Sequence, residues 1–474
     1  MKKIIFLVLM VFVLGACSDN ISDLNIDTKK PEVVPASSLI GHATLNLFDL
    51  MTETNVNWNN FRLWAQQWSQ TTYADESNYE LVERNVNGRM WNTMYATVLR
   101  DIKDAKKFIE ADVVLTQQVK DNQYAILAIM ETYVYSVLVD VFGDVPFTEA
   151  LAEGIITPAY DNDTDIYSTI ISNLNKAIDD LGGATGMEAD LIYGGDAEQW
   201  KKFGNSLKLK LAIRIADLDN AKAKSMAEAA VASGVFTSSD DDFQLAYESS
   251  PPYTNPLWDQ LVQSGRSDFI AANTLGDYMN DLNDPRRAYY FKDLDVDGNV
   301  IGGVYGDNGS FPTSSKPGYI QEDPTHPGTI MSYSEVEFLL ADAVERGYSV
   351  GGTAADHYNA GVTNSIMEWG GSADDAAAYL AQADVAYATA PGTWKEKIAL
   401  QKWIALYDMG FEAWCTYKVY DAPVLNIAAV AQVPTPKRYT YPVTEFSLNG
   451  DNVKAAGVAI GGDLKTTPVF WDVN

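Results

Sequence analysis

Aromatic and amide side chains crowd residues 55–80 of this 474-residue sequence. Flat apolar ring faces can stack on pyranose rings, while amide groups exchange hydrogen bonds with sugar hydroxyls. These residue types therefore predict a carbohydrate-binding surface, in this segment and in other aromatic positions along the chain. The candidate ligand-binding residues are Trp68, Tyr73, Asn78, Tyr79, Tyr253, Trp258 and Tyr305.

The same residues leave a second interpretation open. Phe61, Trp64 and Trp68 are three and four positions apart, which fits one buried face of a helix, and this is the favoured interpretation for these three residues. Tyr73 and Tyr79 follow in a loop-like segment and are better candidates for an exposed aromatic platform. The candidates beyond residue 250 lie among prolines and glycines of the central chain and are proposed on the same ground.

Signatures of catalysis are missing from the sequence. The three histidines, His42, His326 and His357, form no His-Glu-x2-His motif, and neither Gly-x-Ser-x-Gly nor a glycine followed by lysine occurs. Cys415 lies in an apolar helical context and is expected to be a buried structural thiol. We therefore expect a protein that is not an enzyme. A glycosidase needs only two carboxylates, and 64 acidic residues leave that alternative open.

One segment has the spacing of a calcium loop. Asp293, Asp295 and Asp297 alternate before Gly298, so they are candidate ligands of a structural calcium ion, the one cofactor that the sequence suggests. Val304 occupies the twelfth position, where a bidentate glutamate is expected. The same residues also fit a polar hairpin turn, which is the favoured interpretation.

Charge and cysteine content restrict the class of protein. With 34 basic and 64 acidic residues the formal net charge is -30, so nucleic acid would be repelled and is not an expected partner. The two cysteines, Cys17 and Cys415, cannot provide a disulfide framework. The fold must therefore be held by packing.

The N-terminus predicts lipid anchoring. Residues 1–16 have the basic start and apolar centre of a signal peptide, and Leu14-Gly15-Ala16-Cys17 matches a bacterial lipobox. Cys17 is then the lipidated first residue of the mature chain, and residues 17–36 form a tether. No later segment is expected to span a membrane, because residues 125–141 are interrupted by Glu131 and Asp140.

Helical periodicity sets the expected architecture. Trp200-x2-Phe203-Gly204-x2-Leu207 is close to the opening of a tetratricopeptide repeat, in which a small residue lets helices approach. Between the helical blocks, residues 235–333 are rich in glycine and proline and predict loops and hairpins. We expect a mainly α fold, with a helical frame at 37–234 and 334–474 and a loop-rich insertion at 235–333. Apolar residues recur at helical spacing in 91–109, 127–141, 166–181, 199–217, 334–348, 354–369 and 394–407.

Several motifs follow one another in a characteristic order along the chain. They are Leu24-Asn25-Ile26-Asp27, Phe142-Gly143-Asp144-Val145-Pro146-Phe147-Thr148-Glu149-Ala150, Thr274-Leu275-Gly276-Asp277-Tyr278-Met279, Leu282-Asn283-Asp284-Pro285-Arg286, Ser332-Tyr333-Ser334-Glu335-Val336-Glu337-Phe338-Leu339-Leu340-Ala341-Asp342-Ala343, Gln401-Lys402-Trp403-Ile404-Ala405-Leu406-Tyr407 and Gly410-Phe411-Glu412-Ala413-Trp414. Together with the lipobox, these motifs resemble the SusD/RagB family of nutrient-binding outer-membrane lipoproteins. The short acidic stretch Ser18-Asp19-Asn20 is also similar to the surface-export signal of Bacteroidetes lipoproteins.

The resemblance implies a single SusD-like domain over residues 37–474, built on tetratricopeptide-like helical pairs. It further implies a lipoprotein of the outer membrane that faces the cell exterior and acts as a lid on a SusC-like TonB-dependent transporter, to which it passes an oligosaccharide. In some relatives the cargo is a peptide, and that alternative remains open. A helical-repeat scaffold that binds only protein is another, and a surface hydrolase a third.

Overall fold

The computed structural model describes residues 35–187, 189–318 and 323–473. Helices form most of this part of the chain, and its strands form only three two-stranded antiparallel pairs, so the predicted mainly α fold class is confirmed. The predicted signal peptide, Cys17 and nearly all of the tether lie outside the described residues.

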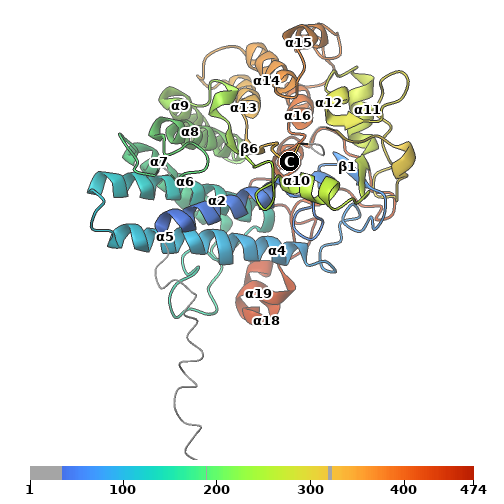
Figure 1. The fold of residues 1–474 in the computed structure, drawn as a ribbon. Helices are drawn as coiled ribbons and strands as arrows, with labels where there is room; N and C mark the ends of the chain where they lie inside the picture. The colour runs from blue at the N-terminus through green and yellow to red at the C-terminus, as the bar shows by residue number, and fades with distance from the viewer. Residues whose placement is uncertain (1–34, 188, 319–322, 474) are drawn as a thin grey trace, which may run out of the picture.

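The N-terminal part of the frame is a set of helices that pack in pairs, α2 with α5, α6 with α7 and α8 with α9 (Figure 1). All four predicted helices are present here, although the one expected over 91–109 has a π-helical middle. The elements are α2 (Ala36–Thr52), α3 (Phe61–Trp64), α4 (Val86–Asn92), the π-helix η2 (Thr93–Leu99), α5 (Arg100–Ala111), α6 (Gln117–Phe142), α7 (Asp163–Asp180), α8 (Ala197–Arg214) and α9 (Asn220–Ser233).

The C-terminal part of the frame adds a second group of helices. Three of them begin with a capping box, in which a hydroxyl and a carboxylate each bond the backbone N–H of the other's residue, at Thr353, Ser372 and Thr393. The helices are α13 (Tyr333–Glu345), α14 (Ala354–Glu368), α15 (Ala373–Leu380), α16 (Trp394–Ala405), α17 (Gly410–Tyr420), α18 (Val443–Leu448) and α19 (Gly450–Ala459).

The predicted loop-rich insertion separates the two groups and lies mainly at the right in Figure 1. Its strands pair with each other or with the frame, and its longest helix, the nine-residue α11, ends shortly before Asp284-Pro285. Its elements are η3 (Ser239–Asp241), β2 (Phe243–Leu245), α10 (Pro256–Trp258), η4 (Asp259–Gln263), β3 (Phe269–Ala271), α11 (Asn273–Asp281), α12 (Arg287–Tyr290), β4 (Phe291–Lys292), η5 (Phe311–Thr313), β5 (Lys316–Pro317) and β6 (Gly328–Met331).

Gly204 shows why the helical pairs need a small residue. A Cβ atom built at Gly204 on α8 would lie 2.8 Å from Cγ1 of Ile178 on α7 and 3.4 Å from Cδ1 of Ile129 on α6. The glycine therefore allows three helices to meet at one point, as the tetratricopeptide-like pattern predicted.

Among the described residues, α6 is the one helix that is long and apolar enough to cross a membrane. However, 89% of its most apolar stretch is buried inside the protein. Its carboxylate Asp140 is also buried, where it accepts hydrogen bonds from Tyr167 and Trp471. Such burial is what the central helix of a folded core requires.

Buried charges join the two parts of the frame. Lys210 of α8 lies 3.0 Å from Glu335 of α13 and 3.6 Å from Glu412 of α17. Arg214 of α8 lies 2.8 Å from the same Glu412, and Lys402 of α16 lies within 3.7 Å of both carboxylates. We call these five residues the buried charge network. Because all five are almost fully buried, each charge depends on its partners for stabilisation.

Candidate functional site

Tyr73 is the predicted aromatic residue that the structure displays most fully. It follows the short strand β1 (Trp68–Gln70), which pairs with β3 through Gln70 and Phe269. Its side chain is 67% exposed, and Cζ of Arg84 lies 5.6 Å from the centre of its ring. A tyrosine held open to solvent beside a cation offers a flat apolar surface with polar groups at its edge.

Gln70 fixes the loop that carries Tyr73. Its amide nitrogen donates to the Tyr73 carbonyl at 3.0 Å and to the Glu76 carboxylate at 2.9 Å. Its amide oxygen accepts from the backbone N–H and the hydroxyl of Ser77. Gln70 and Ser77 are buried, so these bonds are shielded from water. The aromatic ring is thus mounted on a loop that is ordered before any ligand arrives.

Two distant loops support the Tyr73 loop from the side. The Asn78 amide donates to the Gly306 carbonyl at 2.8 Å and accepts from the Ala431 N–H at 2.8 Å. On the other side, the backbone N–H of Thr71 donates to the Asp268 carbonyl. We call the surface formed by residues 71–80, 264–268, 304–310 and 423–433 the loop face.

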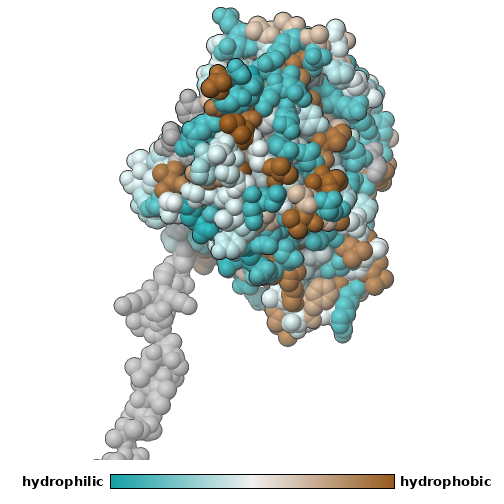
Figure 2. Space-filling model, turned by 90° about the vertical axis from the view of Figure 1, so that its right-hand side faces the viewer, coloured by the Kyte–Doolittle hydropathy of each residue, from teal (hydrophilic) through white to brown (hydrophobic). Residues whose placement is uncertain are grey.

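The loop face mixes apolar and charged groups. In addition to Tyr73, its exposed apolar residues are Val304, Val424, Ile427, Val430 and Val433. Figure 2 looks onto the side of the molecule that lies at the right in Figure 1, where apolar residues form separate brown patches in a largely teal and white surface. Small apolar patches separated by polar groups suit a ligand with both apolar faces and hydroxyl groups.

Two ion pairs of Arg84 hold the base of the Tyr73 loop. Arg84 lies 2.5 Å from the Glu76 carboxylate and 3.2 Å from that of Asp75. Burial raises the pKa of Glu76, while its bond from Gln70 and the charge of Arg84 oppose that rise. Arg84 therefore has two functions, because it stabilises a buried carboxylate and also lines the ring of Tyr73.

Tyr73 has an unusual backbone conformation. Its φ of 54° lies in the left-handed region, which is costly for a bulky side chain. The bond from Gln70 to the Tyr73 carbonyl holds this conformation. Strain that the surrounding structure maintains at an exposed residue points to a functional position.

Three of the other aromatic candidates are buried, which contradicts their assignment to a ligand-binding surface. Trp68 is 0%, Tyr79 1% and Tyr305 1% exposed. The Trp68 indole donates to the Tyr407 hydroxyl, and the Tyr79 ring packs against Trp64 and Tyr305. For Trp68, the favoured interpretation as a core residue is confirmed, but the expected helical face is wrong, because Trp68 lies on β1 and not on α3.

The predicted amide partners are also committed to structure. The Asn78 side chain joins the loops described above, and the Gln66 and Gln67 amides donate to the carbonyls of Asn426 and Leu406. Each of these bonds links segments far apart in the sequence. Amides that bridge loops in this way rigidify the loop face but are not free to bind a ligand.

Tyr253 and Trp258 lie elsewhere on the insertion. Tyr253 is 50% exposed and lines a separate cavity of about 420 Å3 beside α2, together with His42 and Leu191. Trp258 is half-buried at the end of α10. Tyr253 therefore remains a candidate for a platform distinct from that of Tyr73.

The candidate calcium ligands form a turn. Asp295 accepts from the backbone N–H groups of Asp297 and Asn299, as the hairpin interpretation predicted. Asp293 instead lies 2.9 Å from the Lys316 ammonium group. No group of three or more His, Cys, Asp or Glu side chains gathers at a metal-binding distance among the described residues.

A polar cavity of about 330 Å3 lies between the β2–β6 pair and the ends of α14 and α16. Its walls include Asp242, Glu368, Asp408, His326 and Trp369. The Asp408 carboxylate lies 3.1 Å from Nε2 of His326. The pKa of Asp242 is raised, first by burial and then by the negative charge of Glu368. This cavity is where a pair of carboxylates could act on a ligand, a feature that no sequence motif indicated.

The remaining reactive groups have structural partners. His42 and His357 each contact a carboxylate, Asp101 and Glu337 respectively. Cys415 is fully buried, and burial raises the pKa of its thiol to about 12, which confirms the expectation of an inert thiol.

Sequence reasoning missed Gln70 and Arg84, which position the Tyr73 ring. Their types are common, and the contacts they make depend on a turn of the chain that spacing alone does not reveal. A usable signal was the run of amides and acids that surrounds Tyr73, because such residues favour side chain to backbone bonds in loops.

Comparisons with known proteins agree with this architecture. A SusD-like family model, described as starch-binding and associating with the outer membrane, matches residues 28–442. No curated protein matches the chain.

Solved structures give the same result. The chain is similar to a chitin-binding protein, with a TM-score of 0.80, 28% identity and coverage of 93% of this chain and 100% of the other. It is also similar to a chitin-binding SusD homologue from Flavobacterium johnsoniae, with a TM-score of 0.78, 26% identity and coverage of 92% and 99%. A SusD homologue from Bacteroides uniformis has a TM-score of 0.76 at 27% identity, over 92% and 99% of the two chains.

Proposed function

Because this chain belongs to the SusD-like family, we propose that it captures an oligosaccharide at the outer membrane and passes it to a SusC-like TonB-dependent transporter. Lipidation at Cys17 would hold the protein at the membrane, with residues 17–36 as its tether. The observation that carries the proposal is the exposed, rigidly mounted ring of Tyr73.

Binding by Tyr73 would need no movement of the protein. The Gln70 bonds order the loop in advance, so binding does not have to offset the conformational entropy that a flexible loop would lose. One sugar ring would stack on the face of the tyrosine away from Arg84, while Arg84 and its partner Asp75 would bond hydroxyl groups. The net charge of -30 favours a neutral glycan over an anionic one.

The relatives suggest which glycans to test first. Two similar proteins are chitin-binding, and the family description names starch. Titration calorimetry with oligomers of N-acetylglucosamine and of glucose is therefore the first experiment. Loss of a stacked ring costs about 1–2 kcal/mol, so Tyr73→Ala should weaken binding by about 5- to 30-fold, while Tyr73→Phe should retain it.

Tyr253→Ala is the matched control, because it removes an exposed tyrosine that lies in the insertion, away from Tyr73. Unchanged affinity in this variant supports the Tyr73 site. If Tyr253→Ala loses affinity and Tyr73→Ala does not, the binding platform lies at Tyr253 instead. Binding of peptides with no heat from any glycan would favour the peptide-capturing alternative.

Anchoring and partnership need their own measurements. Mass spectrometry of the mature protein should show acyl chains on Cys17, and Cys17→Ala should leave the protein outside the membrane fraction. A SusC-like transporter should copurify with the lipidated protein in mild detergent. Recovery of the wild type from the membrane fraction without lipid on Cys17 would contradict the anchoring.

The polar cavity that Asp242 and Glu368 line supports a second candidate function, hydrolysis of a glycan. Asp242 has a raised pKa beside Glu368, and a protonated carboxyl next to a second carboxyl is what a glycosidase uses. Wild-type protein incubated with the same oligomers should then release reducing ends, and Asp242→Asn should abolish the release. Capture without turnover predicts no release from either protein.

A further inference from the structure

A cavity in the helical frame has no part in the function proposed above. It has a volume of about 260 Å3 and lies between α5, α6 and α7, whereas β1 and the loop face lie on the other side of the molecule (Figure 1). Its fourth wall is the segment 147–151, which continues the Phe142-Gly143-Asp144-Val145-Pro146-Phe147 motif. We call it the frame cavity.

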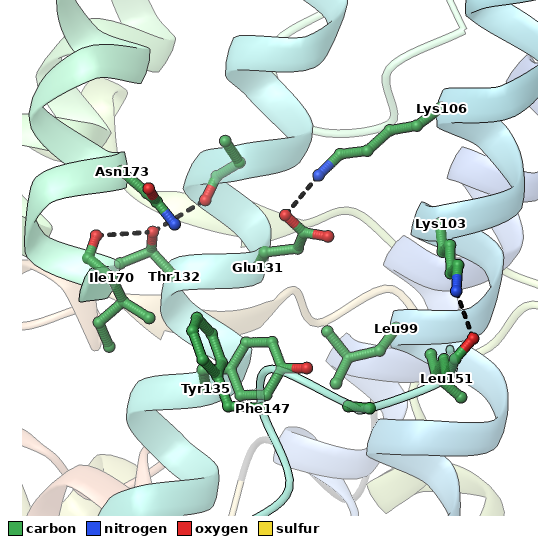
Figure 3. A pocket seen from close by; sticks show the side chains of 12 residues that line it. Leu99, Lys103, Lys106, Glu131, Thr132, Tyr135, Phe147, Leu151, Ile170 and Asn173 are labelled. Atoms are coloured by element: carbon green, nitrogen blue, oxygen red, sulfur yellow. Dashed lines mark hydrogen bonds and ion pairs between the residues drawn. The ribbon is translucent and has the colours of Figure 1, made fainter. Parts of the chain in front are cut away.

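The frame cavity has an aromatic floor. The rings of Tyr135 and Phe147 meet edge to face, with centroids 4.7 Å apart and planes at 82°. Figure 3 shows the two rings side by side, with Leu99 beside them. Phe147 is half-buried, so part of its ring borders the open space. The exposed part of such a ring can stack against the apolar face of one sugar ring.

Polar groups of both kinds stand above the floor. The Lys106 ammonium group pairs with the Glu131 carboxylate across the cavity, as Figure 3 shows. Asn173, on α7, reaches the rim and is exposed. A sugar hydroxyl both donates and accepts, so a neighbouring ammonium, carboxylate and amide match it. Glu131 offsets the charge of Lys106, and the ammonium group of Lys103, which also lines the cavity, donates to the Leu151 carbonyl. Because these charged groups already have partners within the protein, the cavity favours a neutral ligand.

The wall formed by residues 144–151 is held rigidly. The Tyr95 hydroxyl, from the π-helical turn of η2, donates to the Pro146 carbonyl at 2.6 Å. The Asp161 carboxylate accepts from the backbone N–H groups of Phe147 and Thr148 at 2.8 and 2.9 Å. The position of Phe147 is therefore fixed by bonds from two separate elements.

Two local irregularities converge on this cavity. Leu151 has a φ of 58°, which is an outlier for a bulky residue, and the Lys103 ammonium group binds its carbonyl. On the opposite wall, the π-helix η2 ends at Leu99, and π-helical turns are frequent at functional sites. Both deviations from regular structure shape the walls of the same cavity, which indicates that its form is maintained for a purpose.

We propose that the frame cavity is a second carbohydrate-binding site, which takes a single neutral pyranose unit. Its volume falls just below the range of about 300–1,000 Å3 usual for small-molecule sites, which suits one ring and not a chain of them. A terminal or branching sugar would enter, with its flat face on Phe147 and its hydroxyls toward Lys106, Glu131 and Asn173. This site is independent of Tyr73.

Saturation-transfer NMR with methyl glycosides of N-acetylglucosamine and glucose tests the proposal. Phe147→Ala and Asn173→Ala should each reduce the saturation signal by about threefold or more. Asn173 is exposed, so its replacement leaves the fold intact even if Phe147→Ala disturbs the loop. Phe446→Ala, which removes an exposed phenylalanine of α18 outside the cavity, should leave the signal unchanged.

The same measurement separates the two sites. Tyr73→Ala should weaken oligosaccharide binding by about 5- to 30-fold while keeping the signal from the methyl glycosides. The inference is overturned if the wild type gives no signal, if Asn173→Ala matches the wild type, or if the signal disappears only in Tyr73→Ala. A stronger signal from methyl glucuronide would overturn the assignment to neutral sugars. Failure of Tyr73→Ala to reduce oligosaccharide binding would instead contradict the proposed function alone.

Discussion

Two buried glutamates in the charge network should respond differently to loss of charge. Glu412 faces Arg214 at 2.8 Å and two lysines at 3.6 Å, whereas Glu335 faces Lys210 at 3.0 Å and Lys402 at 3.7 Å. Burial alone would raise both pKa values. The three cations outweigh burial at Glu412 and hold its pKa well below the usual range, while the pKa of Glu335 is raised. Ionised Glu412 therefore stabilises the fold, and ionised Glu335 does not.

Glu412→Gln should accordingly be the more damaging substitution. Removing one partner from a buried ionic group costs about 3–5 kcal/mol, because the remaining charges stay buried without compensation. With about 2.1 cal/mol/K of unfolding entropy per residue and about 440 folded residues, this lowers Tm by about 3–5 °C. Glu335→Gln should cost distinctly less, since it also relieves repulsion between the two carboxylates.

Thermal unfolding followed by circular dichroism at several pH values measures both variants. An unfolded glutamate titrates near pH 4.3. Because the folded pKa of Glu412 is lower still, its contribution is complete above about pH 5 and declines as the pH falls below that. The gap between wild type and Glu412→Gln should therefore narrow toward pH 3. Exposed Glu83→Gln is the control and should change stability by less than about 0.5 kcal/mol. An equal or larger loss in Glu335→Gln, or a gap that does not depend on pH, would refute the reasoning.

Two further predictions concern packing and pH. Gly361→Ala should lower Tm despite better helix propensity, because its Cβ would lie 2.9–3.1 Å from the buried Phe338 ring and overpacking costs about 1–3 kcal/mol; a higher Tm in differential scanning calorimetry would contradict this. Asp242→Asn should raise stability more at pH 8 than at pH 4, since burial and Glu368 raise the pKa of Asp242 to about 9, and the wild type loses stability as the pH rises from about 4, where an unfolded aspartate ionises, toward that raised pKa. The exposed Asp384→Asn is the control, and an equal gain at both pH values would argue against the explanation.

The helical frame was predictable because its signal is local. Apolar residues at spacings of three and four mark the buried faces of α6, α7 and α14, and a helix needs only its own sequence to show that stripe. Gly204 is a similar case, since the need for close helix approach follows from its motif. The π-helical turn η2 was not predicted, because apolar spacings of three and four over residues 91–109 do not distinguish a π-helical turn from a regular α-helix.

The aromatic site was only partly predictable, for a reason that Tyr79 makes clear. Its loop-like sequence suggested exposure, but its φ of 69° turns the ring inward against Trp64. Tyr305, more than two hundred residues later, then packs on the same ring. Gly306 hints at this closure, because a Cβ there would lie 2.7 Å from the backbone of residue 429. Whether a ring faces inward thus depends on segments that are remote in the sequence.

Tyr73, unlike Tyr79, remains exposed to solvent. Its strained backbone allows a test in which the stability of the protein and its affinity for glycan change in opposite directions. Asparagine tolerates the left-handed backbone that tyrosine adopts at a cost of about 1 kcal/mol. Tyr73→Asn should therefore raise the stability of the protein slightly while it weakens glycan binding about as much as Tyr73→Ala does, whereas replacing a residue kept only for packing would lower stability. Denaturant unfolding and calorimetry on the same preparation measure both effects. Lower stability in Tyr73→Asn would mean that the ring supports the loop face, and its exposure would then no longer argue for a binding platform.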